Sequence, residues 1–534
     1  MTTLALPLAF PHHGPDDREV PTWVGLVEAS DLAGAPQRVL LESGEQFDRA
    51  RLLVRDRGSV RGYIAVPVVD GEADASAVMD AADRLPAIPP AALPVPQPIT
   101  VVVCTRDRGG LLRESLDAIR AIDYPLMETV VVDNAPSDDE THDLLAHEFP
   151  EFRYVREDRA GLSHARNAGL QAASSSLVAY TDDDVIVDPQ WLWAIAAGFA
   201  RSDDVGCVTG VVPSGELRNA VQAWFDARVS WSKLTAPRTF RLSDPPDDLP
   251  MFPFCVGEFG TGANFAVRRD HILALGGFDT APGAGTRTKG GEDLDMFLRM
   301  LYDGQAIVVN PAAVVWHRHR DDLAALEAQA VGYGRGFGAW AVTVALDPRT
   351  VGAAIARSPR AFARLVNKPM TSVDETTVAA TLSRESKGIG RVELASVLGG
   401  PTAYFAERRA QRDAGIFAGP SSRAIALDRR LWSVLAALGG LFGLLALLPA
   451  AAGVSLAFLA IFILIGPGSL VRAWVPLPPH FAPIVIPALG LSAVILITTA
   501  TVNLQWWAPA LCLLAAATAT CVGAVASFVT ERPA

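Results

Sequence analysis

The stretch that decides the fold is "LVAYTDDDVIV", which runs from residue 177 to residue 187. Three adjacent carboxylates, Asp182, Asp183 and Asp184, follow one apolar run and precede another. Like charges repel, and their burial costs free energy unless a positive group pairs with them. A buried strand that ends in three aspartates therefore predicts a basic partner or a bound cation at its carboxyl end.

Apolar strands alternate with helices on both sides of this stretch. The strands are "ITVVVCT", "ETVVVDN", "FRYVRE" and "LVAYTDDD", and helices such as "LLRESLDAIRAI" and "LSHARNAGLQAA" separate them. This alternation is typical of βαβ units, so we expect an α/β domain with a mainly parallel sheet. Ligands of such sheets bind beyond the carboxyl ends of the strands. Thr105, Asp133 and Asn134 also follow strands, so we expect them beside the aspartates.

Composition limits the class of protein. The chain has 534 residues, half of them hydrophobic, and a net charge of −12, which argues against binding to nucleic acid. Its five cysteines form no CxxC pair, so neither a disulfide framework nor a zinc finger is expected. The first residues, "MTTLALPLAF", carry no basic region, and we expect no signal peptide.

Changes in composition predict five regions. They are a small β-rich domain at 1–84, a proline-rich linker at 85–98, an α/β domain at 99–345, a basic helical segment at 346–428 and a transmembrane domain at 429–530. The runs "RVLLES", "ARLLVRD" and "GYIAVPVVDG" indicate the strands of the first domain. Its sequence indicates no chemistry.

Four apolar stretches follow residue 429, and a bilayer span needs roughly 17–25 such residues. We expect about four transmembrane helices, or three if the second stretch is too short. Arg429, Arg430 and Arg472 lie on one side, so the positive-inside rule places the large N-terminal portion and the C-terminus on the cytoplasmic side of the inner (plasma) membrane. The basic stretch "VGAAIARSPRAFARLV" is either a helix on anionic membrane lipids or a solvated helix face.

Two further motifs carry polar groups. In "KGGEDLDMF", Glu292 and Asp293 begin a helix, where the helix dipole favours carboxylates, so simple capping is one interpretation. Strands "AIVVN" and "AVVWH" follow, and the second ends at His317, which is either structural or a metal ligand. The three aspartates are similarly either a turn cluster or hard oxygen ligands for a divalent cation that also binds phosphates.

In this order, the landmarks "VVVCTRDR", "VVVDN", "GLSHARNAG", "YTDDD", "GTGANFAVRRD", "GGFD", "GGEDLD" and "VVWH" resemble the family 2 glycosyltransferases of the GT-A fold. The resemblance runs from about Pro98 to Trp340. It implies a membrane-anchored bacterial glycosyltransferase that uses a nucleotide-sugar donor and a lipid-linked or cell-envelope glycan acceptor. It also implies Mn²⁺ or Mg²⁺ as the cofactor.

The resemblance assigns roles to individual residues. Asp182, Asp184 and His317 match metal ligands, and Asp293, with its neighbour Glu292, matches the catalytic base. The residues that match contacts to the nucleotide sugar are Thr105, Arg106, Asp133, Asn134, Arg166, Asp182 and Asp183. Asn134 stands where many members have a second aspartate that recognises the base. These roles imply that Asp293 takes a proton from the acceptor hydroxyl, with inversion at the anomeric carbon.

Other functions are weaker interpretations. The chain has neither a GxGxxG motif after a strand nor a GxxxxGK[ST] motif, so NAD chemistry and a P-loop are not supported. It lacks the Gln-x-x-Arg-Trp motif that is usual in processive polysaccharide synthases, which remain an alternative. A catalytically silent scaffold or glycan-binding subunit is another. The glycine-rich stretch "TAPGAGTRTKGG", residues 280–291, is a candidate lid.

Overall fold

The computed structural model describes most of the chain. The described residues are 3–10, 21–34, 36–88, 93–347, 349–350, 352–354, 357, 389–390, 392–414, 422–449, 451–475, 482–503 and 508–529. They divide into two compact units, one made of residues 1–341 and 355–407 and the other of residues 342–354 and 408–534. Arg360 and Arg364 of the predicted membrane-surface helix lie outside the described residues, as does most of the segment around them.

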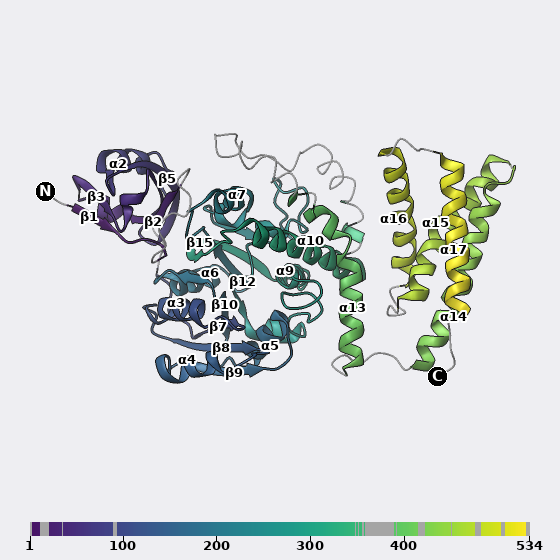
Figure 1. Ribbon diagram of the computed structural model, residues 1–534, viewed down its shortest axis with the longest axis horizontal. Helices are drawn as coiled ribbons and strands as arrows, with labels where there is room; N and C mark the ends of the chain where they lie inside the picture. Colours follow the sequence, from purple (N-terminus) through teal and green to yellow (C-terminus); the bar gives the residue numbers. More distant parts are fainter. Residues whose placement is uncertain are drawn as a thin grey trace. The chain divides into compact units, whose positions relative to one another are not determined.

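The N-terminal part of the first unit is a small β-rich domain, as the sequence predicted. Figure 1 shows this domain beside the N-terminus. Its six strands pair in the order β1-β3-β6-β5-β4-β2. The strands are β1 (Thr3–Leu6), β2 (Thr22–Glu28), β3 (Arg38–Leu41), β4 (Arg49–Asp56), β5 (Ser59–Val69) and β6 (Glu72–Asp74). Helices α1 (Ala29–Leu32) and α2 (Ala75–Asp83) complete the domain. Alternate residues of β5 are buried, which fits a sheet with one face on its own core.

The remainder of the first unit is the α/β domain. Its sheet has the order β11-β15-β12-β14-β10-β7-β8-β9 in the described residues, and β13 pairs with β15. The strands are β7 (Ile99–Thr105), β8 (Met127–Asn134), β9 (Arg153–Glu157), β10 (Leu177–Asp182), β11 (Val185–Val187), β12 (Val205–Val211), β13 (Arg238–Phe240), β14 (Asn264–Arg268) and β15 (Ala306–His317). The main helices are α3 (Gly109–Arg120), α4 (Glu140–Glu148), α5 (Leu162–Ala172), α6 (Trp191–Phe199), α7 (Ala220–Arg228), α8 (Arg269–Ala274), α9 (Glu292–Tyr302) and α10 (Leu323–Leu346).

The two halves of this sheet differ in strand direction. Strands β10, β7, β8 and β9 are all parallel, as predicted from the alternation of strands and helices. Strand β14 is antiparallel to both β10 and β12, and β11 is antiparallel to β15. The sheet is therefore mixed, and its parallel half follows the βαβ pattern.

Strand β15 differs from the prediction of two strands, because "AIVVN" and "AVVWH" form one strand of 12 residues. Pro311, which cannot donate a hydrogen bond to a neighbouring strand, lies between them. The pairing with β12 shifts register there, from Thr209 opposite Val309 to Val211 opposite Val314. This bulge accommodates the proline without ending the strand.

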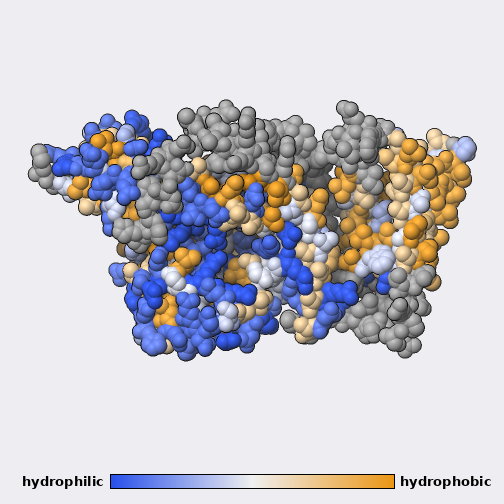
Figure 2. All heavy atoms as spheres, viewed as in Figure 1, coloured by the Kyte–Doolittle hydropathy of each residue, from blue (hydrophilic) through white to orange (hydrophobic). Residues whose placement is uncertain are grey.

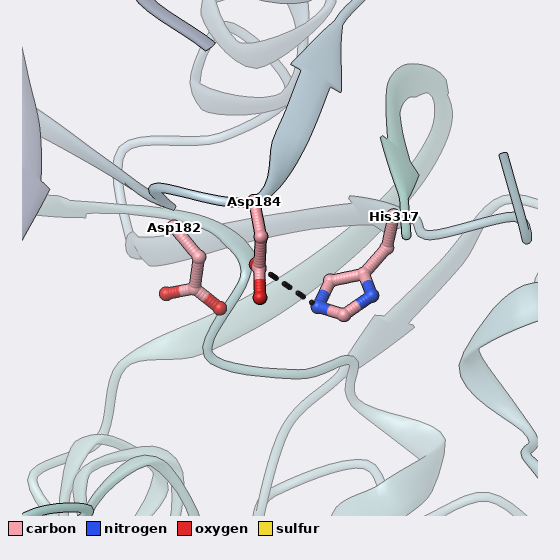
Figure 3. Close-up of side chains that lie close together, drawn as sticks. All are labelled: Asp182, Asp184 and His317. Atoms are coloured by element: carbon pink, nitrogen blue, oxygen red, sulfur yellow. Dashed lines mark ion pairs between the residues drawn. The ribbon is translucent and has the colours of Figure 1, made fainter. Parts of the chain in front are cut away.

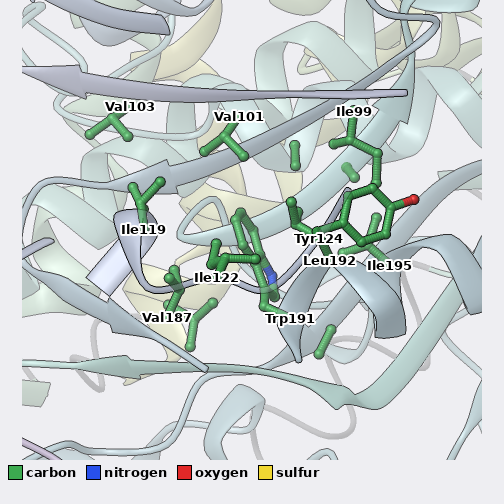
Figure 4. Close-up of a cluster of buried hydrophobic side chains, with 14 of the residues drawn as sticks. Ile99, Val101, Val103, Ile119, Ile122, Tyr124, Val187, Trp191, Leu192 and Ile195 are labelled. Atoms are coloured by element: carbon green, nitrogen blue, oxygen red, sulfur yellow. The ribbon is translucent and has the colours of Figure 1, made fainter. Parts of the chain in front are cut away.

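The core follows from the period of two in the strands. Val101 and Val103 of β7 face a cluster that includes Ile119 of α3 and Trp191 of α6 (Figure 4). Val102 faces the opposite side, where a Cβ on Gly169 of α5 would lie only 2.4 Å from its Cγ1. Helices thus cover both faces of the parallel strands and leave the carboxyl edge for the site.

The second unit contains four apolar helices: α14 (Ser422–Leu445), α15 (Ala452–Trp474), α16 (Ala482–Asn503) and α17 (Pro509–Val529). By length and composition, two described helices can cross a membrane, at Ala452–Trp474 and Pro509–Phe528. Within the most apolar stretch of each of these two helices, only 22% of the residues are buried, so most of the side chains face outward. Figure 2 shows hydrophobic residues over these helices. The expectation of about four spans stays a prediction.

The close contact of Gly169 with β7 gives a test of the packing. We expect Gly169→Ala to lower the free energy of unfolding by about 1–3 kcal/mol, because the new methyl group overpacks the core against Val102. Urea unfolding followed by tryptophan fluorescence measures this change. Gly110→Ala on α3 is the matched control, since a Cβ there meets nothing within 4 Å. Equal losses in both variants would contradict the packing described.

Candidate active site

Three parallel strands bring polar groups to one edge of the sheet. The register pairs Asp182 of β10 with Cys104 of β7, and Thr105 of β7 with Asp133 of β8. Strand ends that lie level in the sheet place their following residues close together. The structure thus positions the strand-end residues beside one another, at the edge that the topology indicated.

Asp182, Asp184 and His317 converge at this edge (Figure 3). One ligand atom from each residue lies within 4.8 Å of the other two, and Nε2 of His317 is 3.3 Å from Oδ1 of Asp184. The convergence has a local cause, because β11 pairs with the end of β15 and sets Val185 opposite His317. Asp184, one residue earlier, therefore faces the histidine although 132 residues separate them in the chain.

The middle aspartate points elsewhere. Oδ2 of Asp183 accepts a hydrogen bond from the Thr105 hydroxyl at 2.7 Å, and its Oδ1 accepts one from Nη1 of Arg108 at 2.9 Å. The same Arg108 nitrogen lies 3.3 Å from Oδ2 of Asp184. Arg108 is thus a basic partner of the aspartates that the sequence interpretation missed. The one feature of the sequence that could have indicated this role is the position of Arg108 in "TRDR", three residues after the end of β7.

Arg166 is the second basic partner, and it is almost completely buried. Its Nη1 donates to Oε1 of Glu292 at 2.9 Å, its Nη2 donates to the carbonyl oxygen of Gly262 at 3.0 Å, and Nη2 also lies 3.9 Å from Asp182. The resemblance implied that this arginine reaches the donor. In the structure its guanidinium bridges carboxylates from β10 and α9.

Asp293 lies beside this bridge, at the start of α9. Its Oδ2 accepts a hydrogen bond from the backbone N–H of Gly262 at 2.9 Å, and its side chain is partly exposed. A Cβ at Gly262 would lie 2.6 Å from Nη2 of Arg166 and 3.3 Å from Oδ2 of Asp293. Glycine at position 262 therefore permits the close approach of the arginine and the aspartate.

Burial controls the charge at this edge. Desolvation raises the pKa of Asp182 to about 8, Arg166 opposes the shift, and the carboxylates of Asp184 and Asp183 add to it. Desolvation likewise raises the pKa of Glu292, against the effect of Arg166. With a pKa of about 8, the Asp182 carboxyl group holds a proton near neutral pH unless more positive charge arrives. The site therefore has a deficit of positive charge that a divalent cation would remove.

The other residues that the resemblance assigned to donor binding lie at the same edge. They differ in how exposed they are and in how far their polar atoms already have hydrogen-bond partners within the protein. Arg106 is half exposed and lies 3.7 Å from Asp107. Asp133 is buried, accepts a hydrogen bond from the Tyr154 hydroxyl, and has a pKa raised by burial. Asn134 accepts a hydrogen bond from the N–H of Gly161 and donates one to the carbonyl oxygen of residue 159, so its amide holds the turn that precedes α5.

The candidate lid, residues 280–291, is an ordered turn. Its ends join in a bridge between Gly283 and Gly290, and the carbonyl oxygen of Ala284 accepts a hydrogen bond from the N–H of Leu162. The turn therefore packs on the start of α5, where the Ser163 hydroxyl also donates to the carbonyl oxygen of Pro282. Its opening and closing stay a prediction.

Comparisons with known proteins concern mainly the α/β domain. The sequence model of Glycosyl transferase family 2 matches residues 100–272. Residues 100–272 therefore match a family 2 glycosyltransferase domain, which confirms for this part of the chain the resemblance predicted from the sequence.

Three relatives show how far the likeness extends. A glucosyl-dolichyl phosphate glucuronosyltransferase of Haloferax volcanii is 24% identical over 41% of this chain and 69% of its own length. The succinoglycan biosynthesis protein ExoM of Rhizobium meliloti is 31% identical over 41% and 65%. The pre-mycofactocin glycosyltransferase of Mycobacterium tuberculosis is 27% identical over 44% and 46%. The match thus spans only about half to two thirds of these relatives.

Among solved structures, the chain is similar to a mannosyltransferase from Pyrobaculum calidifontis in complex with GDP-Man and Mn²⁺. The identity is 20% and the TM-score 0.39, over 58% of this chain and 87% of that one.

The bridge formed by Arg166 gives a second prediction. We expect Arg166→Met to lower the free energy of unfolding by about 3–5 kcal/mol, because it leaves Glu292 buried without its positive partner. The additional change Glu292→Gln should recover part of the loss, since residue 292 then carries no charge that needs a partner. Denaturant unfolding of the three proteins measures both effects.

The matched control for this prediction is Arg241→Met, which removes the arginine of a surface pair with Asp204. An exposed pair contributes less than about 1 kcal/mol. Losses of similar size in Arg166→Met and Arg241→Met would show that the buried bridge is not a structural element of the site.

Proposed function

We propose that this protein transfers a sugar from a nucleoside-diphosphate sugar to a hydroxyl group of a lipid-linked or cell-envelope glycan, with inversion at the anomeric carbon. The observation that carries the proposal is the convergence of Asp182, Asp184 and His317 beside Asp293 at the carboxyl edge of the sheet. The acceptor class is supported by two relatives, whose names refer to a dolichyl phosphate and to succinoglycan.

The converging residues fit a divalent metal. Two carboxylates and one imidazole supply hard oxygen and nitrogen donors, a set that suits Mn²⁺, and Mg²⁺ with added water ligands. The raised pKa of Asp182 fits the same assignment, because the carboxyl groups lack sufficient positive charge among the described residues. A bound cation would neutralise charge on the leaving diphosphate. We assign Asp182, Asp184 and His317 as the residues that hold it.

The chain's own residues then have distinct tasks. Arg108 and Thr105 hold Asp183, which keeps the aspartate loop in place at the end of β10. Arg166 places Glu292 and, through Gly262, the neighbouring Asp293. Asp293 is the base that takes the proton from the acceptor hydroxyl as its oxygen attacks the anomeric carbon. One base on the face opposite the leaving group implies inversion.

The location follows from the second unit. Helices α15 and α17 are apolar and long enough to cross a membrane, and Arg472 lies at the end of α15. Membrane helices with basic residues on one side orient that side toward the cytoplasm. We propose that the protein spans the inner membrane several times and that its catalytic domain uses cytoplasmic donor. A processive synthase and a silent scaffold are the alternatives.

Replacement of the base gives the first functional prediction. We expect Asp293→Asn to reduce sugar transfer by about 10²–10⁴-fold, because an amide cannot accept the proton. Mn²⁺-dependent thermal stabilisation by the donor should persist, since Asp293 is not a metal ligand. The measurement uses full-length protein and a panel of nucleotide sugars. Asp303→Asn, at the exposed end of the same helix, is the matched control and should retain wild-type turnover.

Unchanged turnover in Asp293→Asn would show that another group is the base. If the wild type binds donors but transfers no sugar to any envelope acceptor, the scaffold interpretation is supported instead. Chain length of the product separates single transfer from a processive synthase, and the anomeric configuration of the product, measured by NMR, tests inversion.

Removal of metal gives a further prediction. We expect EDTA to abolish transfer and added Mn²⁺ to restore it, because charge on the departing diphosphate is otherwise uncompensated. The variants Asp184→Asn and His317→Ala should need higher Mn²⁺ concentrations for half-maximal activity. Full activity in EDTA would exclude the proposed metal site.

A further inference from the structure

The N-terminal domain contacts both chain segments that carry the proposed metal ligands. We propose that this domain positions the metal site, and that Arg51 and Arg55 of β4 hold the segments of His317 and Asp184. This role presupposes the metal-dependent transfer proposed above. It gives a task to a domain whose sequence indicated no chemistry.

The first contact reaches the segment of Asp184. Nη1 of Arg55 donates to Oδ1 of Asp188 at 2.6 Å, and both side chains are only 7% exposed. Asp188 follows β11, the strand that begins directly after Asp184, and its N–H donates to the carbonyl oxygen of Val314 in β15. The guanidinium also donates to Glu28 of its own domain at 2.6 Å. Arg55 thus fixes the far end of the short strand that sets Asp184 opposite His317.

The second contact reaches the segment of His317. Nη1 of Arg51 lies 2.6 Å from Oδ2 of Asp226 on α7, whose Oδ1 accepts a hydrogen bond from the Ser214 hydroxyl at 2.6 Å. Ser214 forms a bridge with His317, the N–H of His317 donates to the carbonyl oxygen of Pro213, and the carbonyl of His317 accepts from the N–H of Gly215. A chain of direct contacts therefore leads from Arg51 to the backbone of the histidine.

Apolar packing joins the two domains around these ion pairs. One cluster contains Phe10, Val24, Leu53 and Val60 from the N-terminal domain and Val211, Leu217, Val314 and Trp316 from the α/β domain. Phe10 lies so close to Gly215 that a Cβ there would be 2.1 Å from the ring. Arg318, next to His317, stacks over the same ring, with its guanidinium carbon 4.7 Å from the centroid. The N–H of Thr22 also donates to the carbonyl oxygen of Leu217.

Association of the N-terminal domain with the α/β domain does not require the ion pairs of Arg51 and Arg55. An apolar interface of this kind provides free energy of association by itself, whereas a buried ion pair gains little because its desolvation offsets the attraction. What a buried, hydrogen-bonded pair does contribute is a fixed geometry. Arg55 holds the segment that carries Asp184, and Arg51 acts through Asp226 and Ser214 on the segment that carries His317. Groups outside the ligands that fix ligand orientation are expected to act in this way.

Mn²⁺ binding to the full-length protein tests the proposal without a sugar substrate. The electron paramagnetic resonance signal of free Mn²⁺ disappears on binding and gives the dissociation constant. We expect Arg51→Met to weaken binding about tenfold, the size typical of lost outer-shell partners. Arg51→Lys, which keeps the charge, should recover most of the affinity. Arg38→Met is the matched control, because it removes a surface pair with Glu72 within the same domain and should bind like the wild type.

Ser214→Ala is a second variant, included in case Arg51→Met fails to fold, because it removes only one hydroxyl group. Because Arg51 and Ser214 act through the same aspartate, each change should weaken Mn²⁺ binding and the double variant should be little weaker than either single one. The spectrum of bound Mn²⁺ should broaden in these variants, as the ligand geometry becomes less uniform. A loss of stability alone would not change that spectrum.

The outcomes separate this proposal from the one on which it depends. Wild-type Mn²⁺ affinity and spectrum in Arg51→Met and Ser214→Ala would overturn the positioning role and leave the proposed function intact. Effects of the two changes that multiply in the double variant would also overturn it, because they would then act independently. A wild type that binds no Mn²⁺ would remove the metal site and, with it, both proposals.

Discussion

The site depends on compensation of buried negative charge. Asp182, Asp183, Asp184 and Glu292 gather at one sheet edge. Two arginines contact them: Arg108, which directly precedes α3, and Arg166 of α5. These arginines do not complete the compensation, because the pKa values of Asp182 and Glu292 remain raised by burial. The remaining deficit has the sign and place that suit a divalent cation. The fold holds the carboxylates close together against their mutual repulsion and desolvation, and a bound cation would lower this free-energy cost.

The position of the proposed metal ligands depends on a short strand. The three residues of β11 pair with the end of β15 and thereby set a histidine opposite an aspartate. Such a short strand contributes few hydrogen bonds, so its position depends on what lies beside it. The N-terminal domain supplies that support through Arg55 on one side and Phe10 on the other. Fold and site are thus linked through contacts that cross the boundary between the two domains.

The sequence predicted the parallel half of the sheet well because each βαβ unit is a local pattern. Strands β7, β8 and β10 were visible as apolar runs, and their polar ends marked the site edge. The antiparallel pairing of β14 with β10 and β12 could not be predicted, since nothing local states which distant strands are neighbours. The proline in "AIVVNPAAVVWH" suggested a break, and only the register shift against β12 shows why the strand continues.

By itself the sequence indicated the resemblance to family 2 glycosyltransferases, the expected order of the regions and the candidate residues Asp182, Asp184, Asp293 and His317, because motif, spacing and hydrophobic period are properties of the chain alone. Only the tertiary structure decided that Asp183 turns to Thr105, that Asn134 holds a turn, and that Arg166 bridges Asp182 and Glu292. It alone connected Arg51 to His317 through Asp226 and Ser214. These contacts join residues that lie far apart in the sequence. The sequence does not give the distances between such residues in space, and those distances decide which buried charged and polar groups pair.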